Sequence, residues 1–202
     1  DNKTRLQSSS GGIFSLLAEQ ILDSKGIIFG ASFDEDFNVR HISVHNKSEL
    51  SQLRGSKYIQ SYTGDTFKET KQILDGGRNV LYSGTPCQIA GLYKFLGKDY
   101  QNLLTCDVIC HGVCSTKVYR DILSYYERKY KTKIMDVKFR DKKTGWKNSS
   151  VKITFESGKV VSEIRNISLL AYGFAAGFTN NKTCSMCKHA IIPRRADLTF
   201  GD

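Results

Sequence analysis

The stretch Val80-Leu-Tyr-Ser-Gly-Thr-Pro-Cys87 decides the fold class, because it has the pattern of a buried strand, a tight turn and a helix start. The apolar run from Val80 to Tyr82 is typical of a short strand in the core of a sheet. Pro86 suits the first turn of a helix, where its missing N–H would be unpaired in any case. Cys87 is therefore expected just inside a helix, where its thiol faces the positive end of the helix dipole and becomes more acidic.

The alternation of strands and helices extends over the rest of the chain. Helices are predicted over residues 12–24, 48–53, 65–74, 87–96, 115–130 and 167–178, and strands over 27–33, 39–44, 80–82, 103–109 and 197–200. Ser48 is expected to cap the second of these helices. Alternating apolar residues between 134 and 161 predict an antiparallel strand pair. The sequence therefore predicts an α/β fold with a mixed, partly parallel sheet flanked by helices, and a cysteine-bearing C-terminal loop.

The composition is that of an ordinary globular domain. The chain has 202 residues, of which 40% are hydrophobic and 25% are charged. These values favour one domain over residues 1–202, which can be divided into lobes 1–62 and 63–202. The sequence starts without Met and stops directly after a predicted strand. Both ends are therefore expected to be cuts through a longer protein.

Charge and hydropathy patterning disfavour several classes of protein. No apolar run approaches the roughly 18 residues that a membrane span needs, and no secretory signal opens the sequence. The net charge is +10, but no nucleic-acid-reading motif accompanies the basic residues. Those between 129 and 147 favour a solvated face, or a groove for phosphate-bearing cofactors or acidic redox partners. We expect a cytoplasmic protein with no membrane span and no nucleic-acid partner.

The six cysteines carry the strongest chemical signal. Without a secretory signal, thiols at such spacings favour metal binding over disulfides. Cys184-Ser-Met-Cys187 has a spacing that zinc and iron–sulfur sites share. Cys87 and Cys110 each follow an apolar strand, and the carboxyl ends of neighbouring parallel strands meet at one edge. We therefore expect Cys87 and Cys110 to meet there, with the Cys184–Cys187 loop completing a four-thiolate site.

The other two cysteines and one histidine have plainer interpretations. Cys106, inside a predicted strand, is expected to be a small buried hydrophobe. Cys114 is interpreted as a surface thiol or a spare ligand. His111 is interpreted as a structural residue, with a role as ligand or proton donor as the alternative. From the residues alone, zinc and an iron–sulfur cluster remain equally open for the four-thiolate site.

Seven short motifs occur in a fixed order along the chain. They are Ser8-Ser-Ser-Gly-Gly12, Arg54-Gly-Ser-Lys-Tyr58, Ser83-Gly-Thr-Pro-Cys-Gln88, Ile109-Cys-His-Gly112, Phe139-Arg-Asp-Lys142 with Gly145-Trp146, Cys184-x-x-Cys187 and Ala196-Asp-Leu-Thr-Phe-Gly-Asp202. Together they resemble the beta subunit of coenzyme F-420 hydrogenase/dehydrogenase over essentially the whole chain.

This resemblance implies a flavoprotein that holds FAD and one [4Fe–4S] cluster and passes electrons between a hydride carrier and further clusters. It implies that Cys87, Cys110, Cys184 and Cys187 are the cluster ligands. Cys114 departs from the family pattern, in which proline is common at that position. Either cofactor can be absent from a fragment purified in air.

The resemblance also implies partners. These are a hydride-carrying coenzyme of the deazaflavin or nicotinamide type, and a ferredoxin-like domain or subunit. Many bacterial relatives carry an N-terminal two-cluster ferredoxin-like segment, and its absence from this sequence agrees with the expected cut.

FAD needs a site for its pyrophosphate, and two loops are candidates. Residues 9–12 open the first predicted helix, where free N–H groups favour phosphate and glycines allow close approach. An ordinary serine N-cap is the alternative for this loop. Residues 55–58 offer a cation and an aromatic ring, with a plain surface lysine as the alternative for Lys57. The predicted cofactor-binding residues are Ser9, Ser10, Gly11, Gly12, Gly55, Ser56, Lys57, Tyr58 and Thr85.

Three functions compete for this sequence. An electron-transfer oxidoreductase is favoured by the resemblance. A zinc-stabilised basic binding module is one alternative. A thiol-nucleophile enzyme using Cys87 is the other, and it would need a base, for which His111 is the candidate.

Overall fold

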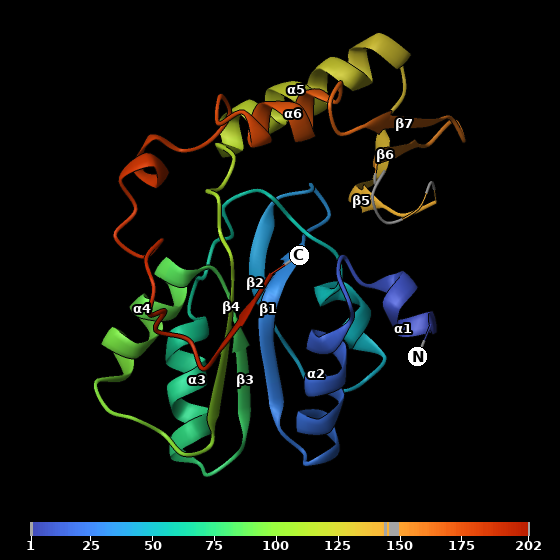
Figure 1. Cartoon of the computed structure of the whole chain (residues 1–202). Helices are drawn as coiled ribbons and strands as arrows, with labels where there is room; N and C mark the ends of the chain where they lie inside the picture. Colours follow the sequence, from blue (N-terminus) through green and yellow to red (C-terminus); the bar gives the residue numbers. More distant parts are fainter. Residues whose placement is uncertain (1, 144, 146–149, 202) are drawn as a thin grey trace. The chain divides into compact units, whose positions relative to one another are not determined.

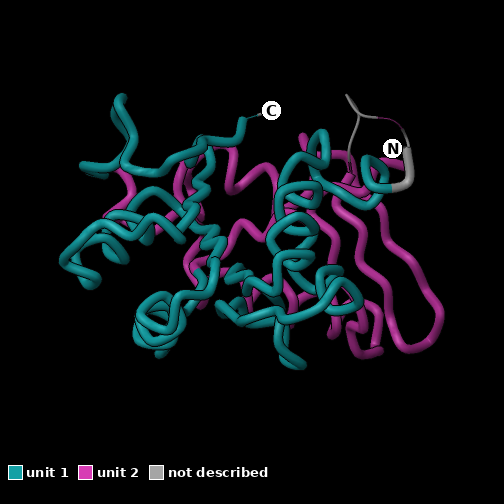
Figure 2. The backbone as a smooth tube through the Cα atoms, turned by 90° about the horizontal axis from the view of Figure 1, so that it is seen from below, with its two compact units in different colours: residues 1–54, 61–110, 186–202 teal, residues 55–60, 111–185 magenta. Residues whose placement is uncertain are grey.

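The computed structural model of the chain describes residues 2–143, 145 and 150–201 (Figure 1). Trp146 and Asp202, which belong to the motifs above, lie outside the described residues. The chain forms two compact units (Figure 2). Unit 1 comprises residues 1–54, 61–110 and 186–202, and unit 2 comprises residues 55–60 and 111–185. The division into lobes 1–62 and 63–202 stays a prediction.

Unit 1 is built on a five-stranded sheet in the order β2-β1-β3-β4-β8. Its strands are β1 (Ile27–Phe33), β2 (Val39–Val44), β3 (Val80–Ser83), β4 (Leu103–Val108) and β8 (Leu198–Phe200). Strands β1, β3, β4 and β8 are parallel, whereas β2 is antiparallel to β1. The predicted mixed, partly parallel sheet is therefore confirmed. Its antiparallel member is β2, and not the strands between residues 134 and 161.

Helices cover both faces of this sheet (Figure 1). They are α2 (Ile13–Asp23), the 3-10 helix η1 (Glu49–Leu53), α3 (Thr66–Asp75) and α4 (Pro86–Leu96), and a further short helix, α1 (Asn2–Gln7), precedes α2. Successive side chains of a strand point to opposite faces. Leu81 accordingly packs with α2 and η1 in one apolar core, while Val80 and Tyr82 pack with α3 and α4 in the other.

Unit 2 has a separate antiparallel sheet in the order β5-β6-β7. Its elements are α5 (Thr116–Tyr130), β5 (Ile134–Asp141), β6 (Ser150–Phe155), β7 (Val160–Ile164), α6 (Leu169–Ala175) and the 3-10 helix η2 (Lys182–Met186), whose last residue falls in unit 1. Helix α5 buries Tyr119, Leu123 and Tyr126, which recur at the spacing of one helix face. The predicted strand pair is thus three strands, because the chain turns at Gly158 and continues as β7.

Ser48 does not cap η1 as predicted. Its backbone is already helical, with φ −67° and ψ −31°, and its hydroxyl donates to the Asn46 side-chain oxygen at 2.5 Å. Asn46 Oδ1 also accepts from the Glu49 N–H at 3.1 Å. Asn46 therefore accepts a backbone N–H that has no partner within this helix, a role that asparagine fills as well as serine.

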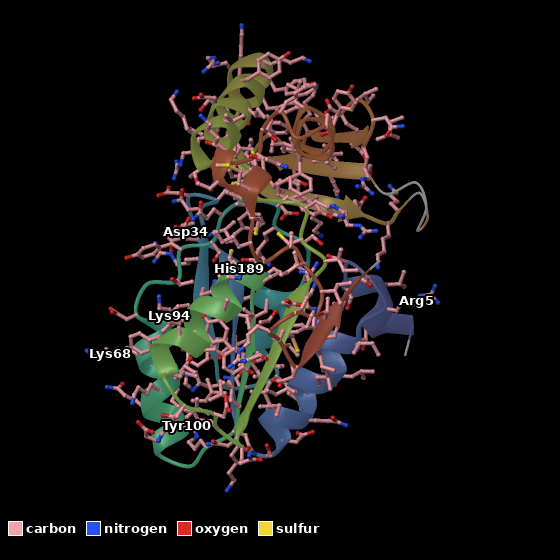
Figure 3. All side chains as sticks on the ribbon, turned by 60° about the vertical axis from the view of Figure 1, so that its left-hand side comes forward. Arg5, Asp34, Lys68, Lys94, Tyr100 and His189 are labelled. Carbon is pink, nitrogen blue, oxygen red and sulfur yellow. The ribbon has the colours of Figure 1, made fainter. Side chains whose placement is uncertain are left out.

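Basic side chains are spread over the surface. Lys68 and Lys94, for example, project outward from α3 and α4 (Figure 3). Within the described part of the chain, no helix is long and apolar enough to cross a membrane.

Replacing Cys106 by alanine tests the assignment of this thiol to the core. The side chain is fully buried among apolar residues, and burial raises the pKa of its thiol to about 12. Cys106→Ala should lower the free energy of unfolding by about 1–2 kcal/mol, as expected for losing one small buried group. Urea unfolding measures this change. A neutral result would show that the side chain contributes nothing to packing.

Candidate functional site at the carboxyl edge of the sheet

Two of the predicted ligand cysteines lie in the segments that directly follow neighbouring parallel strands. Strands β3 and β4 pair with Tyr82 opposite Thr105 and Ser83 opposite Cys106. Both strands therefore end at the same edge of the sheet. Cys87 follows β3 through a short turn, and Cys110 comes two residues after β4. This is the edge at which parallel α/β sheets bind ligands.

The turn that carries Cys87 is closed by a capping box. Thr85 is the N-cap of α4, and its N–H donates to Gln88 Oε1 at 2.9 Å. The Thr85 hydroxyl lies 3.1 Å from both Gln88 Oε1 and Cys87 Sγ. A hydroxyl can donate or accept, so Thr85 can serve Cys87 either as thiol or as thiolate. The exposed Cys87 side chain is thus fixed at the start of a helix.

A buried histidine braces the same turn from strand β2. The His41 Nε2–H donates to the Ser83 carbonyl at 2.9 Å, so Nδ1 accepts from the Ser61 hydroxyl at 2.7 Å. Gln88 Nε2 donates to the Ser61 carbonyl at 3.1 Å. Sequence reasoning missed His41, Ser61 and Gln88 as supporting residues, because their partners are distant in the chain.

The six free cysteines divide by burial. Cys106 and Cys114 are buried, whereas Cys87 is exposed and Cys110, Cys184 and Cys187 are half-buried. Cys114 is therefore not a surface thiol, and burial raises its pKa. The four accessible thiols are the four predicted ligands.

Thiol chemistry fits a cluster, which takes Cys ligands as thiolates. The geometry is not a closed site, however. Within the described residues, no group of three or more His, Cys, Asp or Glu side chains is arranged to hold a metal ion.

The segment after Cys110 lies against Cys184 within unit 2. Gly112 has φ +119°, and a Cβ on it would sit 2.9 Å from Asn180 Nδ2 and 3.3 Å from Cys184 Cβ. No side chain fits there without displacing one of these groups. The peptide two residues after Cys110 is therefore packed directly on a predicted ligand cysteine.

The chain beyond Cys187 returns to strand β4 in unit 1. Asp197 Oδ2 accepts from the Thr105 N–H and hydroxyl, both at 2.7 Å. Thr199 donates to the buried Asp107 at 2.6 Å, and Arg194 Nη1 lies 4.0 Å from the other oxygen of that carboxylate. Polar bonds to two β4 side chains thus fix β8, while residues 188–193 before it are all exposed.

The first predicted phosphate loop is held by Arg54. Its guanidinium donates to Gln7 Oε1 at 2.6 Å before the loop, and to Ser15 Oγ at 3.1 Å after it. The N-cap of α2 is Gly12, with φ +94°, and no side chain caps the first turn. The alternative of an ordinary serine N-cap is therefore not what the structure has. Around Gly11 the Cβ position is open, which leaves room for an anion at the helix start.

The second predicted loop belongs to unit 2. Lys57 is half-buried and donates to the Gly55 carbonyl at 3.2 Å. Burial lowers the pKa of Lys57 to about 8. The Tyr58 ring packs within unit 2 against Phe139 and Phe174, at centroid distances of 5.4 and 4.6 Å. Lys57 is thus a cation that a phosphate would stabilise.

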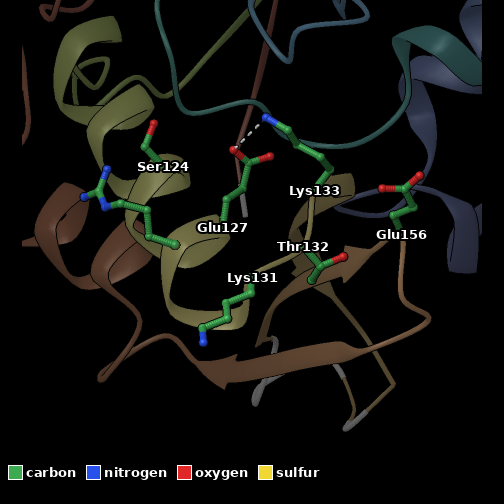
Figure 4. A pocket seen from close by; sticks show the side chains of 7 residues that line it. Ser124, Glu127, Lys131, Thr132, Lys133 and Glu156 are labelled. Atoms are coloured by element: carbon green, nitrogen blue, oxygen red, sulfur yellow. Dashed lines mark ion pairs between the residues drawn. The ribbon is translucent and has the colours of Figure 1, made fainter.

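An open pocket of about 470 Å³ lies at the end of α5 (Figure 4). Charged residues of both signs line it, and Glu127 pairs with Lys133 at 3.7 Å. Its lining residues are Ser124, Glu127, Arg128, Lys131, Thr132, Lys133 and Glu156. None of the predicted ligand or cofactor residues is among them.

The sheet of unit 1, with Cys87 and Cys110 in the segments that follow β3 and β4, defines an α/β protein with thiols at the carboxyl edge of a partly parallel sheet. Residues 77–202 match the family model that describes the C terminus of the coenzyme F420 hydrogenase/dehydrogenase beta subunit. The chain belongs to this family, as the motifs predicted.

Structural comparison agrees with this membership. A chain of the F420-reducing [NiFe] hydrogenase complex from Methanosarcina barkeri, solved as a xenon derivative, superposes with a TM-score of 0.61 at 16% sequence identity. The match covers 93% of this chain and 62% of that chain. At this identity the likeness shows the fold alone. No curated protein sequence matches this chain.

Gly112 should tolerate no side chain. Gly112→Ala adds backbone strain and crowding against Asn180 and Cys184, and should cost about 2–4 kcal/mol of unfolding free energy. Gly158→Ala is the matched control in unit 2, because it has φ +80° but open space at its Cβ position. Urea unfolding of both variants separates crowding from strain. Equal costs would show that the packing on Cys184 is loose.

Proposed function

We propose that this chain is the electron-transfer core of a flavin- and iron–sulfur-dependent oxidoreductase. The observation that carries the proposal is the pairing of β3 with β4, which brings the Cys87 and Cys110 segments to one edge of the sheet in a member of this family. Partner molecules would be a hydride-carrying coenzyme, of deazaflavin or nicotinamide type, and a ferredoxin-like domain or subunit. Carboxyl-edge thiols of this kind are suited to hold a redox centre near a bound cofactor.

Cys87, Cys110, Cys184 and Cys187 would hold one [4Fe–4S] cluster. All four thiols are accessible, and the Cys184–Cys187 pair sits on a single helical turn and the residue after it. Residues 188–193 are all exposed, so few contacts restrain the segment that follows Cys187. The braced turn around Thr85 would keep Cys87 fixed at the start of α4.

Residues 9–12 and 55–58 would hold the pyrophosphate of FAD, with Thr85 as a further contact. The uncapped first turn of α2 and the open approach at Gly11 support the first loop. Arg54 would link the two loops, because its side chain is hydrogen-bonded on either side of the first loop and its backbone directly precedes Gly55, where the second loop begins. When bound, FAD accepts electron pairs and releases single electrons, which a cluster accepts one at a time.

The two alternatives predict other behaviour. A nucleophilic Cys87 would need a base, for which His111 is the candidate, and its thiol would react fast with a blocking reagent at neutral pH. His41, which braces its turn, has partners at both ring nitrogens. A zinc-stabilised module would use the same thiols but would be colourless.

Anaerobic purification tests the proposal. The protein should be brown, with iron, sulfide and flavin bound and no stoichiometric zinc. Cys184→Ser and Cys187→Ser should each abolish cluster incorporation, because each removes one of four ligands. Cys106→Ala is the matched control and should keep its iron. Iron and sulfide equal to wild type in both serine variants would remove these thiols from the ligand set.

Lys57 should make FAD binding depend on pH. Burial lowers the pKa of Lys57 to about 8 in the protein without FAD, and a bound phosphate would favour the charged lysine and raise this pKa. Below pH 8 the lysine is charged with or without FAD, so the affinity should be flat. Above pH 8 binding takes up a proton, so the affinity should fall by up to about tenfold per pH unit. Equilibrium titration with FAD between pH 6 and 9 measures this.

Lys57→Met supplies the control for this titration. It should bind FAD more weakly at low salt and lose the fall above pH 8, since no titrating cation remains. If wild-type protein bound FAD with the same affinity at pH 6 and at pH 9, Lys57 would not be a phosphate contact.

A further inference from the structure

A short antiparallel ladder in unit 2 sets the register between two chain segments near Cys184. The Ser115 N–H donates to the Thr179 carbonyl at 2.8 Å, and the Asn181 N–H donates to the Val113 carbonyl at 2.9 Å. Asn180 pairs with Cys114 between them. The register therefore places Asn180 at a fixed position opposite the segment that begins at His111.

Cys184 follows this ladder by one tight turn. Its N–H donates to the Asn181 carbonyl at 2.9 Å. Asn180 Nδ2 and Cys184 Cβ both lie within 3.3 Å of the single point that a Cβ on Gly112 would occupy. The Asn180 amide and the Cys184 side chain are thus neighbours across the missing side chain of Gly112.

The orientation of the Asn180 amide follows from its hydrogen bonding. Nδ2 donates to the His111 carbonyl at 3.3 Å, and the opposite orientation would set two acceptors against each other. Oδ1 is buried and has no partner in the described part of the chain. An amide nitrogen carries two hydrogens, so one remains beyond the bond to His111. A buried amide oxygen without a partner calls for a functional explanation.

We propose that Asn180 positions Cys184 and directs its second amide N–H to the Cys184 thiolate when this thiolate ligates iron. Hydrogen bonds to cluster sulfurs stabilise the reduced, more negative state and so raise the reduction potential. Asn180 would then set the potential of the cluster as well as the placement of one ligand. This role rests on the proposed function, because it presumes that Cys184 ligates a cluster.

Asn181 provides a matched control next to Asn180. Its side-chain Nδ2 donates to Gln60 Oε1 at 2.6 Å, and it is half-buried like Asn180. Asn180→Asp and Asn181→Asp therefore make the same charge change at adjacent positions. Asn180→Leu removes the amide without adding charge, and it serves if the aspartate variant does not fold.

The first measurement uses metal-free protein. Alkylation rates of Cys184 are compared with those of Cys187 in the same molecule by mass spectrometry. In both Asn180 variants the ratio of the Cys184 alkylation rate to the Cys187 alkylation rate should rise about tenfold. The reason is that the Asn180 amide, which packs beside Cys184, is lost. The ratio in Asn181→Asp should equal that of wild type.

The second measurement is the midpoint potential of the anaerobically loaded protein, followed by its electron paramagnetic resonance signal. Asn180→Leu should lower the potential and Asn180→Asp should lower it further, whereas Asn181→Asp should stay close to wild type. A residue that only stabilised the fold would change the melting temperature without this ordering of potentials.

The outcomes separate the two claims. Wild-type potential and wild-type labelling ratio in Asn180→Leu would overturn the role of Asn180, with the proposed function intact. Wild-type protein without iron, together with a raised labelling ratio in the Asn180 variants, would overturn the cluster and uphold the positioning of Cys184. If Asn181→Asp lowered the midpoint potential as much as Asn180→Asp does, the added charge alone would explain the change. That result would overturn the role of the Asn180 amide.

Discussion

The parallel hydrogen bonding of β3 with β4 is the constraint on which the candidate site depends. It places Ser83 opposite Cys106, so the strands end together and the segments leading to Cys87 and Cys110 start from one edge. A shift of register by one residue would turn Tyr82 and Leu81 to the wrong cores. The apolar faces that stabilise the sheet therefore also fix the thiol-bearing turns. Capping by Thr85 and Gln88 and bracing by His41 refine an arrangement that the sheet already imposes.

Burial divides the cysteines into two groups with different physical roles. Cys106 and Cys114 are enclosed, and desolvation holds the pKa of each thiol above its usual range. Such thiols stay protonated near neutral pH, and a protonated thiol is a poor ligand and a poor nucleophile. The accessible cysteines are those that a metal or a reagent can reach. This division makes the ligand assignment testable cysteine by cysteine.

Much of the fold could be predicted from local sequence, and the failures have common causes. The apolar segment 27–33 and the segment 39–44 form strands with the predicted bounds. The separate sheet of unit 2 was not predicted, because sequence periodicity identifies strands and not their partners. Ser48 was expected as a cap, but the side chain that accepts a backbone N–H at this helix start is Asn46, which accepts from Glu49. For the site, the thiols and glycine loops could be identified by residue type. His41, Arg54 and Asn180 could not, since each acts through partners in other segments.

The fold of unit 1 does not depend on the proposed ligands. Its two apolar cores are formed by residues of β1, β3 and β4 with α2 on one face and α3 and α4 on the other, and Cys106 is the cysteine they contain. Metal binding to such a protein would contribute little to the sheet, unlike in small domains that are unfolded without metal. Metal binding would instead stabilise residues 188–193, which are exposed and lie in the sequence between Cys187 and the tail that is hydrogen-bonded to β4. A sheet that is complete without metal can thus present thiols at its edge while the loop beside it remains adjustable. The reduction potential of the proposed cluster would then depend on local hydrogen bonds and not on the stability of the core.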